Sequence, residues 1–515
     1  MARPIRLLSG FLTVGGWTLL SRILGFVRDL MIAATLGSGP VAQAFLVAFA
    51  LPNMFRRFFA EGAFNTAFVP LFSKRLEAGE GAAGFARDAM SALAALLIVL
   101  TLVAQLAMPA LVFAMASGFA GDARFDLAVG YGRIVFVYIL LISLAALLSG
   151  VLNASGRFMA AAAAPTLLNV VLIAALLLGA RLGGDTGLWL SYAVPLAGVA
   201  QLALVWVAAK RAGFAIMPRR PRLTPELKRL AVIAAPAALA GGVMQINLLV
   251  GRQVASFFDG AVAWLNYADR LYQLPLGVVG IAIGVVLLPE LSRRLAAADD
   301  AAGRDAISRA AEFGLLLSLP ATVALMVAAG PITSVLFERG AFTAADAKAT
   351  ALAVAVYGAG LPAFVLLKVV QPLFFAREDT RTPFRFAVVA MVVNIVVAVG
   401  GMGSLGFIAA AWGTTLAAWV NLILLWRRAS AFGPVATLDA RAATRIPRLG
   451  LAALAMGLVL WAITWSLPGW FEAAGWRYLA LAGLVAAGAV SYFGLAFALG
   501  GVSVAEVRAR LRRRS

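Results

Sequence analysis

Residues 21–74 read SRILGFVRDLMIAATLGSGPVAQAFLVAFALPNMFRRFFAEGAFNTAFVPLFSK, and the rest of the chain is organised around this segment. Two long apolar segments are joined here by the uncharged turn GSGP. The same segments carry six charged residues, namely Arg22, Arg28, Asp29, Arg56, Arg57 and Glu61. Apolar surroundings indicate lipid, whereas the charges indicate water or a polar ligand.

The free-energy cost of placing these charges inside a membrane argues that they have a function. An arginine at the centre of a membrane helix costs about 2.5 to 3.5 kcal/mol on insertion scales, so three cost about 7 to 10 kcal/mol. Charged residues inside membrane segments usually face a cavity or a partner rather than lipid. We therefore interpret the arginines as lining a cavity that receives an anion.

The composition supports a membrane protein. Of the 515 residues, 63% are hydrophobic and 13% are charged, with a mean hydropathy of +0.95. Soluble domains average about 45 to 50% apolar and 25% charged residues. Cysteine and histidine are absent, which excludes disulfides and removes the commonest general base and metal ligand. The composition thus argues against an enzyme, and the apolar segment after residues 1–6 predicts a retained first span rather than a cleaved signal peptide.

Apolar runs predict fourteen membrane spans, each long enough to cross about 30 Å of hydrocarbon. They lie at about 8–36, 42–72, 89–116, 127–153, 158–180, 187–209, 229–257, 261–291, 307–329, 347–376, 384–402, 406–426, 449–467 and 478–500. The predicted fold is an all-α integral membrane protein. It has two six-helix lobes in a parallel pseudo-two-fold repeat around a central cavity, plus two C-terminal helices.

The net charge of +20 follows the predicted topology. With the N-terminus inside, 30 basic residues fall in inside segments, 5 fall outside and 8 lie within spans. This asymmetry matches the positive-inside rule with both termini cytoplasmic. Nucleic-acid binding is therefore not needed to explain the charge.

Three sequence similarities between the two halves of the chain indicate a duplicated six-helix unit. FVPLFSKRLEAG at 68–79 resembles LLPELSRRLAAA at 287–298, and QLALVW at 201–206 resembles NLILLW at 421–426. Asn169 and Asn394 occupy similar apolar contexts 225 positions apart. An even number of spans per copy keeps both copies in one orientation, as in two-lobed transporters. We predict an N-lobe at 1–215, a C-lobe at 216–430 including the cytoplasmic linker 211–228, and a C-terminal part at 431–515 with two spans and a basic cytoplasmic tail.

The charged positions of the first half form two groups. Arg22 and Arg28 are six residues apart, about 120° from a common helix face, so both reach one cavity only if the helix bends, for which Gly25 is suited. In the second span, Arg57 and Glu61 have the i,i+4 spacing of a pair. That spacing leaves Arg56 for a ligand or a headgroup. Asn53 follows Pro52, where the interrupted helix exposes backbone carbonyls to polar partners, so Asn53 is a further candidate for substrate binding.

The second half repeats the pattern in NYADRLYQLP at 266–275, which carries Asp269 and Arg270. A structural salt bridge is the alternative for each Arg–Asp pair, and we favour it slightly for Asp29 and Asp269. For Arg22, Arg28 and Arg270 we favour the cavity, because basic residues outnumber acids within the spans. Guanidinium groups bind phosphate through two parallel hydrogen bonds and stay charged. The predicted ligand is a phosphorylated lipid head.

At these residues the sequence resembles the MurJ/MviN lipid II flippases of the multidrug/oligosaccharidyl-lipid/polysaccharide exporter superfamily. The resemblance covers all fourteen spans and rests on five motifs taken together. They are SRILGFVRD (21–29), LPNMFRRFFAEGAF (51–64), ADRLYQLPLGVVGIAIGVVLLPELSR (268–293), LFERGAFT (336–343) and KVVQPLFFAREDTRTP (368–383).

The resemblance implies a transporter rather than an enzyme. Its expected substrate is lipid II, an undecaprenyl-pyrophosphate disaccharide-pentapeptide, moved from the inner to the outer leaflet for cell wall biosynthesis. The cavity arginines of the family map onto Arg22, Arg28 and Arg270, with Arg56 and Glu61 on further functional positions. The implied mechanism is alternating access, in which Arg22, Arg28 and Arg270 hold the pyrophosphate and the polyprenyl tail stays in lipid.

Two positions depart from the family pattern. Gln43 stands where many members carry an acid, and Gly251, beside Arg252, stands where some carry an aspartate linked to sodium binding. We therefore expect no bound cofactor or metal and doubt sodium coupling, leaving the membrane potential or another monovalent cation as driving force. The expected setting is the bacterial inner membrane, with membrane lipids and other cell-wall synthesis proteins as partners of a monomer.

Three alternatives stay open. Another polyprenyl-linked oligosaccharide flippase or a cation-coupled drug exporter of the same superfamily is the nearest, although an exporter of cations needs carboxylates in its cavity. A non-transporting scaffold or receptor would tolerate loss of Arg22 and Arg270. A membrane glycosyltransferase lacks support, because no paired-carboxylate motif appears on a loop.

Overall fold

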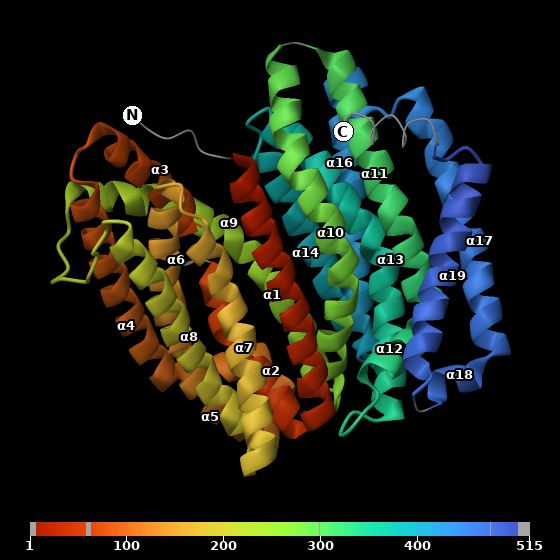
Figure 1. The fold of residues 1–515 in the computed structure, drawn as a ribbon, viewed down its shortest axis with the longest axis horizontal. Helices are drawn as coiled ribbons and strands as arrows, with labels where there is room; N and C mark the ends of the chain where they lie inside the picture. The colour runs from red at the N-terminus through yellow and green to blue at the C-terminus, as the bar shows by residue number, and fades with distance from the viewer. Residues whose placement is uncertain (1–6, 58–62, 298, 474, 503–515) are drawn as a thin grey trace. The chain divides into compact units, whose positions relative to one another are not determined.

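The structure is a computed structural model that describes residues 7–57, 63–297, 299–473 and 475–502. Within these ranges every regular element is a helix (Figure 1). The only β-type pairing in the described ranges is an isolated antiparallel bridge between Arg339 and Phe342. The predicted all-α class is confirmed.

Nineteen α-helices and two short 3-10 helices are described. The first part of the chain forms α1 (Leu7–Leu36), α2 (Pro40–Arg56), α3 (Ala63–Ala78), α4 (Ala82–Met115), η2 (Ser117–Phe119), α5 (Ala123–Phe136), α6 (Tyr138–Ala154), α7 (Met159–Leu182), α8 (Thr186–Arg211) and α9 (Pro225–Ser256). The second part forms α10 (Ala261–Ala296), α11 (Asp300–Val327), α12 (Ala329–Phe337), α13 (Ala344–Phe375), α14 (Arg381–Gly400), α15 (Met402–Leu405), α16 (Ile408–Ala429), η3 (Ser430–Ala436), α17 (Ala440–Ser466), α18 (Pro468–Glu472) and α19 (Arg477–Ala498).

Ten helical segments in the described ranges are long and apolar enough to cross a membrane. They coincide with ten of the fourteen predicted spans, the third to sixth and the ninth to fourteenth. The other four predicted spans coincide with α1, with α2 and α3, with α9 and with α10. The chain is thus a multi-pass integral membrane protein, and the count of fourteen stays a prediction.

Polar caps fix where many helices begin. A side-chain oxygen at the N-cap accepts a backbone N–H that the first helical turn leaves without a partner. Six described helices begin this way, after Asp122 (α5), Asp185 (α8), Thr224 (α9), Asp299 (α11), Thr343 (α13) and Asp439 (α17). Thr343 and Asp346 form a reciprocal capping box at the start of α13. Between α1 and α2 the chain turns at Gly37, whose φ of 61° favours glycine.

The chain divides into two compact units, Met1–Ala263 with Arg339–Phe342, and Trp264–Glu338 with Thr343–Ser515. Helix α9 belongs to the first unit because its C-terminal end is bonded to the segment after α4. Gln253 accepts a hydrogen bond from the backbone of Ser117 at 2.7 Å and donates one to the carbonyl of Ala114 at 2.8 Å. The boundary of the compact units therefore differs from the predicted lobe boundary at 215–216. That boundary was drawn from the sequence repeat and stays a prediction.

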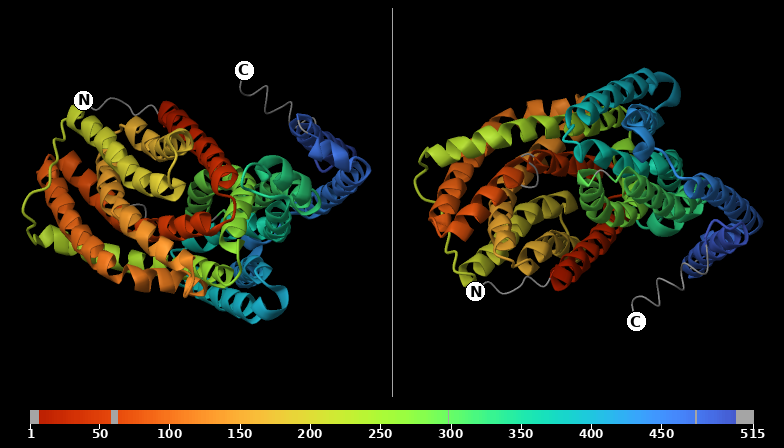
Figure 2. Two further views of the ribbon diagram at one scale, coloured as in Figure 1. Left: turned by 90° about the horizontal axis from the view of Figure 1, so that it is seen from below. Right: turned by 90° about the horizontal axis from the view of Figure 1, so that it is seen from above.

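The two C-terminal helices pack on each other within the second unit, as the two views in Figure 2 show for α17 and α19. Their contact buries Leu449, Met456 and Leu460 of α17 against Leu484 and Tyr492 of α19. The Tyr492 hydroxyl donates to the carbonyl of Leu316 on α11 at 2.9 Å. The pair is therefore anchored to α11 by both apolar packing and a polar contact.

Candidate functional site

A buried polar site of the first unit surrounds Arg28 on α1. Arg28 is 6% exposed and Asp29 is 3% exposed. The Nη2 of Arg28 lies 2.7 Å from Oδ1 of Asp29, and its Nε donates to the same oxygen at 3.0 Å. A buried charge needs such a partner, because removing it from water costs several kcal/mol. The expected structural salt bridge of Asp29 is present in the structure.

Asn169 on α7 is the third member of this site. Its Oδ1 accepts a hydrogen bond from Nη1 of Arg28 at 2.8 Å, and its Nδ2 donates to the carbonyl of Ser21 at 2.8 Å. The amide therefore joins α7 to two positions of α1 and fixes the direction of the guanidinium. Gly25 faces this amide, since a Cβ at that position would lie 3.5 Å from Nδ2.

Asn169 was recognised from the sequence only as a marker of the repeat. A buried asparagine in an apolar span needs polar partners, which was the available signal. Its counterpart Asn394 on α14 is also buried, at 0% exposure compared with 6% for Asn169. At Asn394 the near neighbour is Gly413, where a Cβ would lie 2.4 Å from the asparagine Oδ1. The two halves thus keep a buried asparagine in different surroundings.

Arg22 lies on the same helix as Arg28 but is exposed. The structure shows no partner for its side chain among the described residues. Arg22 and Arg28 thus differ in exposure, as expected for positions about 120° apart on a helix. Whether α1 bends to bring both to one cavity, and whether either binds substrate, stay predictions.

The charges of the second span are only partly described. Asn53 uses its Nδ2 to donate to the carbonyl of Phe49 at 2.7 Å, within α2. Arg56 is half-buried, and Arg57 is exposed at the C-terminal end of the helix. Glu61 lies outside the described residues, so its predicted pairing with Arg57 stays a prediction.

Gln43 is fully buried and connects three segments of the first unit. Its Nε2 donates to Oδ1 of Asp259 at 3.0 Å, and its Oε1 accepts from Nη1 of Arg124 at 3.3 Å. Arg124 also pairs with Asp122 at 2.5 Å. The hydrogen bond from Arg124 to the side chain of Asp122 lowers the pKa of that carboxyl. A carboxylate in place of Gln43 would face both the acid Asp259 and the guanidinium of Arg124, whereas the amide donates to the first and accepts from the second.

The predicted residues of the second half lie on α10. Asp269 and Arg270 are both half-buried, and the side chain of Gln273 donates to the Asp269 carboxylate. Arg270 belongs to the second unit, so its convergence with Arg22 and Arg28 stays a prediction. Gly251 on α9 is half-buried, and a Cβ there would meet no atom within 4 Å. Among the described residues, no group of three or more acidic residues has a geometry able to hold a metal ion.

Comparisons with known proteins identify relatives along the whole chain. The family model described as "Lipid II flippase MurJ" matches residues 32–503. A "Probable lipid II flippase MurJ" from Rhizobium meliloti (strain 1021) is 47% identical over 517 residues, covering 98% of this chain and 96% of the relative. A "Lipid II flippase MurJ" from Burkholderia cenocepacia is 38% identical over 398 residues, covering 76% of this chain and 77% of the relative.

Solved structures share the fold. A structure described as "Lipid II flippase MurJ, inward closed conformation" aligns with a TM-score of 0.78 at 23% identity, covering 94% of this chain and 97% of the other. An inward-facing multidrug resistance transporter of the MOP superfamily aligns with a TM-score of 0.67 at 16% identity, covering 80% and 95%. At such identities these likenesses show the fold alone.

Proposed function

The chain belongs to the family of the lipid II flippase MurJ, and we propose that it moves lipid II from the inner to the outer leaflet for peptidoglycan synthesis. The observation that carries this proposal is the 47% identity to a relative of that description over 98% of the chain. As a flippase, the chain is a transporter and not an enzyme, because moving a lipid between leaflets makes or breaks no covalent bond.

The charged residues of α1 support an anionic headgroup as the ligand. Arg22 presents an exposed guanidinium on a largely apolar helix, and such a group suits a pyrophosphate. Arg28 uses three of its five N–H donors on Asp29 and Asn169. We propose Arg22 as the main contact of the first half, with Arg28, Arg56 and Arg270 as further contacts.

The proposed mechanism is alternating access of two lobes. A bound ligand shifts such an equilibrium only through different affinities for the two states. Arginines from both halves of the sequence would supply this difference, because an anion held by both favours the closed arrangement. The undecaprenyl tail needs no polar site and stays in the lipid phase.

The proposed setting is the bacterial inner membrane with both termini cytoplasmic, which the 30 to 5 division of basic residues supports. We propose a monomer without a bound cofactor that works in contact with membrane lipids and other cell-wall synthesis proteins. Because Gly251 stands where some family members carry an aspartate linked to sodium binding, we propose the membrane potential or another monovalent cation as the driving force.

The test is depletion of the protein in cells, followed by measurement of lipid II exposed on the outer leaflet. Wild type should restore the signal, whereas Arg22→Ala and Arg270→Ala should not. Arg181→Ala is the matched control, because Arg181 is an exposed arginine at the C-terminal end of α7. Normal outer-leaflet lipid II after depletion would reject the proposal. Loss of another polyprenyl-linked oligosaccharide from the outer leaflet would favour the related carrier instead.

A further inference from the structure

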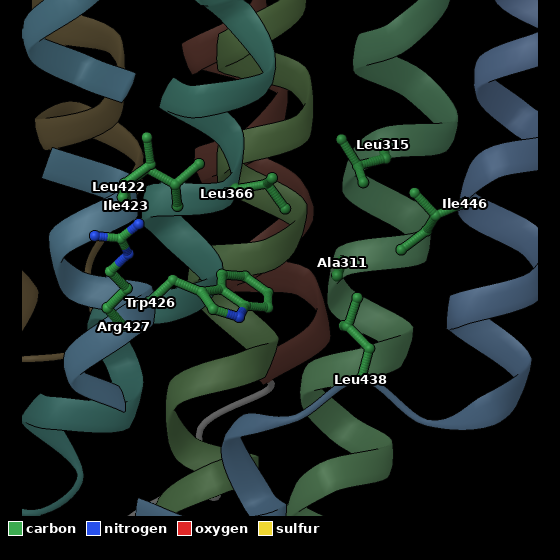
Figure 3. Close-up of a pocket in the computed structure, with 9 residues that line it drawn as sticks. All are labelled: Ala311, Leu315, Leu366, Leu422, Ile423, Trp426, Arg427, Leu438 and Ile446. Carbon is green, nitrogen blue, oxygen red and sulfur yellow. The ribbon is translucent and has the colours of Figure 1, made fainter. Parts of the chain in front are cut away.

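A cavity of about 390 Å³ lies within the second unit, among α11, α13, α16 and α17 (Figure 3). Figure 3 shows the Trp426 ring reaching from α16 toward α11. The other walls are apolar side chains, including Ala311, Leu315, Leu366, Leu422, Leu438 and Ile446. Its volume is in the range of small-molecule sites, which bind mainly apolar groups with a few oriented polar contacts.

One charged residue lines this cavity. Arg427 follows Trp426 near the C-terminal end of α16 and is exposed. No acid pairs with its guanidinium among the residues that the structure describes. Figure 3 shows its side chain running along α16 at the edge of the cavity. The cavity thus combines an apolar interior with a positive charge at its margin.

Two acidic residues adjoin lining residues in the sequence, and both pair with arginines other than Arg427. Glu312, which follows Ala311, accepts from Nη1 of Arg309 at 2.7 Å and lies 3.6 Å from Nε of Arg441 and 3.9 Å from Nη1 of Arg445. Asp439 pairs with Arg309 and caps α17 by accepting from the backbone of Ala442 at 2.7 Å. Three arginines therefore engage these two acids, and the charge of Arg427 is additional.

We propose that this cavity binds an anionic phospholipid, with an acyl chain among the apolar residues and the phosphate on Arg427. The apolar lining excludes a free phosphate as the complete ligand, because it would leave the cavity empty. A lipid without a phosphate would fill the cavity but leave Arg427 without an anion, and a zwitterionic phospholipid would bring a cationic headgroup next to Arg427 together with its phosphate. Basic pockets between transmembrane helices are known to bind anionic headgroups, and the arginine fork fits a phosphate. This lipid is a resident ligand, separate from the transported one.

The test uses the purified full-length protein in phosphatidylcholine nanodiscs, with bound lipid counted by native mass spectrometry. Phosphatidylglycerol with the same acyl chains should bind the wild type more tightly than added phosphatidylcholine. Arg427→Gln should weaken phosphatidylglycerol binding about tenfold or more, the loss expected for one charge-assisted contact. Arg428→Gln is the matched control, because Arg428 is also exposed but does not line the cavity. It should bind like the wild type.

A second variant tests the cavity itself. Ala311→Leu adds three carbons to a wall residue that is 1% exposed, so it should abolish binding of phosphatidylglycerol at this site. Equal binding of the two lipids to wild type, or equal losses in Arg427→Gln and Arg428→Gln, would overturn the proposal. Displacement of phosphatidylglycerol by lipid II would also overturn it and would assign the cavity to the transported substrate. None of these measurements depends on transport.

Discussion

Arg22 and Arg28 lie six residues apart on α1, but their side chains differ in exposure and in hydrogen bonding. Around Arg28 the guanidinium is 6% exposed and bonded to Asp29 and Asn169. Around Arg22 the side chain is exposed, and it has no partner among the described residues. The comparison shows that two arginines of one apolar helix can have different environments. Arg28 is bonded to Asp29 and Asn169 and connects α1 to α7, whereas the side chain of Arg22 is exposed and available to a ligand.

The largest effect is expected from Arg28→Ala. The substitution leaves the buried Asp29 without its guanidinium partner, and breaking a buried pair in this way costs about 3 to 5 kcal/mol. The thermal unfolding temperature of the purified protein should fall strongly, and rescue of depleted cells should fail. The double variant Arg28→Met with Asp29→Asn should recover part of the stability, because neither charge remains. A wild-type unfolding temperature in Arg28→Ala would show that the pair is not structural.

Arg22→Ala should separate function from folding. Its stability should stay within about 0.5 kcal/mol of wild type, as for most exposed positions. Transport of lipid II into the outer leaflet of reconstituted vesicles should fall about tenfold or more, because a charge-assisted contact to the pyrophosphate is lost. Arg181→Ala should leave both properties unchanged. If Arg22→Ala transports normally, the exposed arginine is not a substrate contact.

Asn169→Ala should have an intermediate effect on stability. It removes the acceptor for Arg28 and the donor to the Ser21 carbonyl, and leaving such buried groups without a partner costs about 1 to 3 kcal/mol. Thermal unfolding measures this loss. Asn53→Ala is the control, since the hydrogen bond of the Asn53 amide that the described residues show stays within its own helix, to the carbonyl of Phe49. Equal losses in both variants would contradict a special role for Asn169 between α1 and α7.

The smallest effect is expected from Gly25→Ala. An added Cβ would lie 3.5 Å from Nδ2 of Asn169, an ordinary contact, and alanine favours a helix by about 1 kcal/mol over glycine. The unfolding temperature should therefore stay the same or rise slightly. A clear loss of transport in a stable Gly25→Ala protein would support the predicted bend of α1.

The matching glycine of the second half should behave differently. Gly413→Ala should destabilise the protein by about 1 to 3 kcal/mol, because its Cβ would lie 2.4 Å from Oδ1 of Asn394. Thermal unfolding measures this loss.

Much of the fold was predictable because membrane helices are local structures. A bilayer requires each backbone polar group to be bonded within its own helix, so length and apolarity alone identify a span. Ten predicted spans coincide with the apolar helices of the described ranges. The pairing of Arg28 with Asp29 was also considered from the sequence, since the two residues are adjacent. The family could be recognised because its motifs are continuous segments.

That the chain is an apolar membrane protein of many helices, with arginines that are costly to bury, can be read from the residues alone, because hydropathy and charge are properties of single residues. Which of the charges have a partner depends on how the helices pack in the folded protein. Asn169 reaches Arg28 across 141 positions, and Gln43 reaches Asp259 across 216 positions. Neither contact has a spacing rule, because it depends on which helices pack together. The same reason explains why the apolar cavity beside Arg427 is visible only after four separate helices have been assembled.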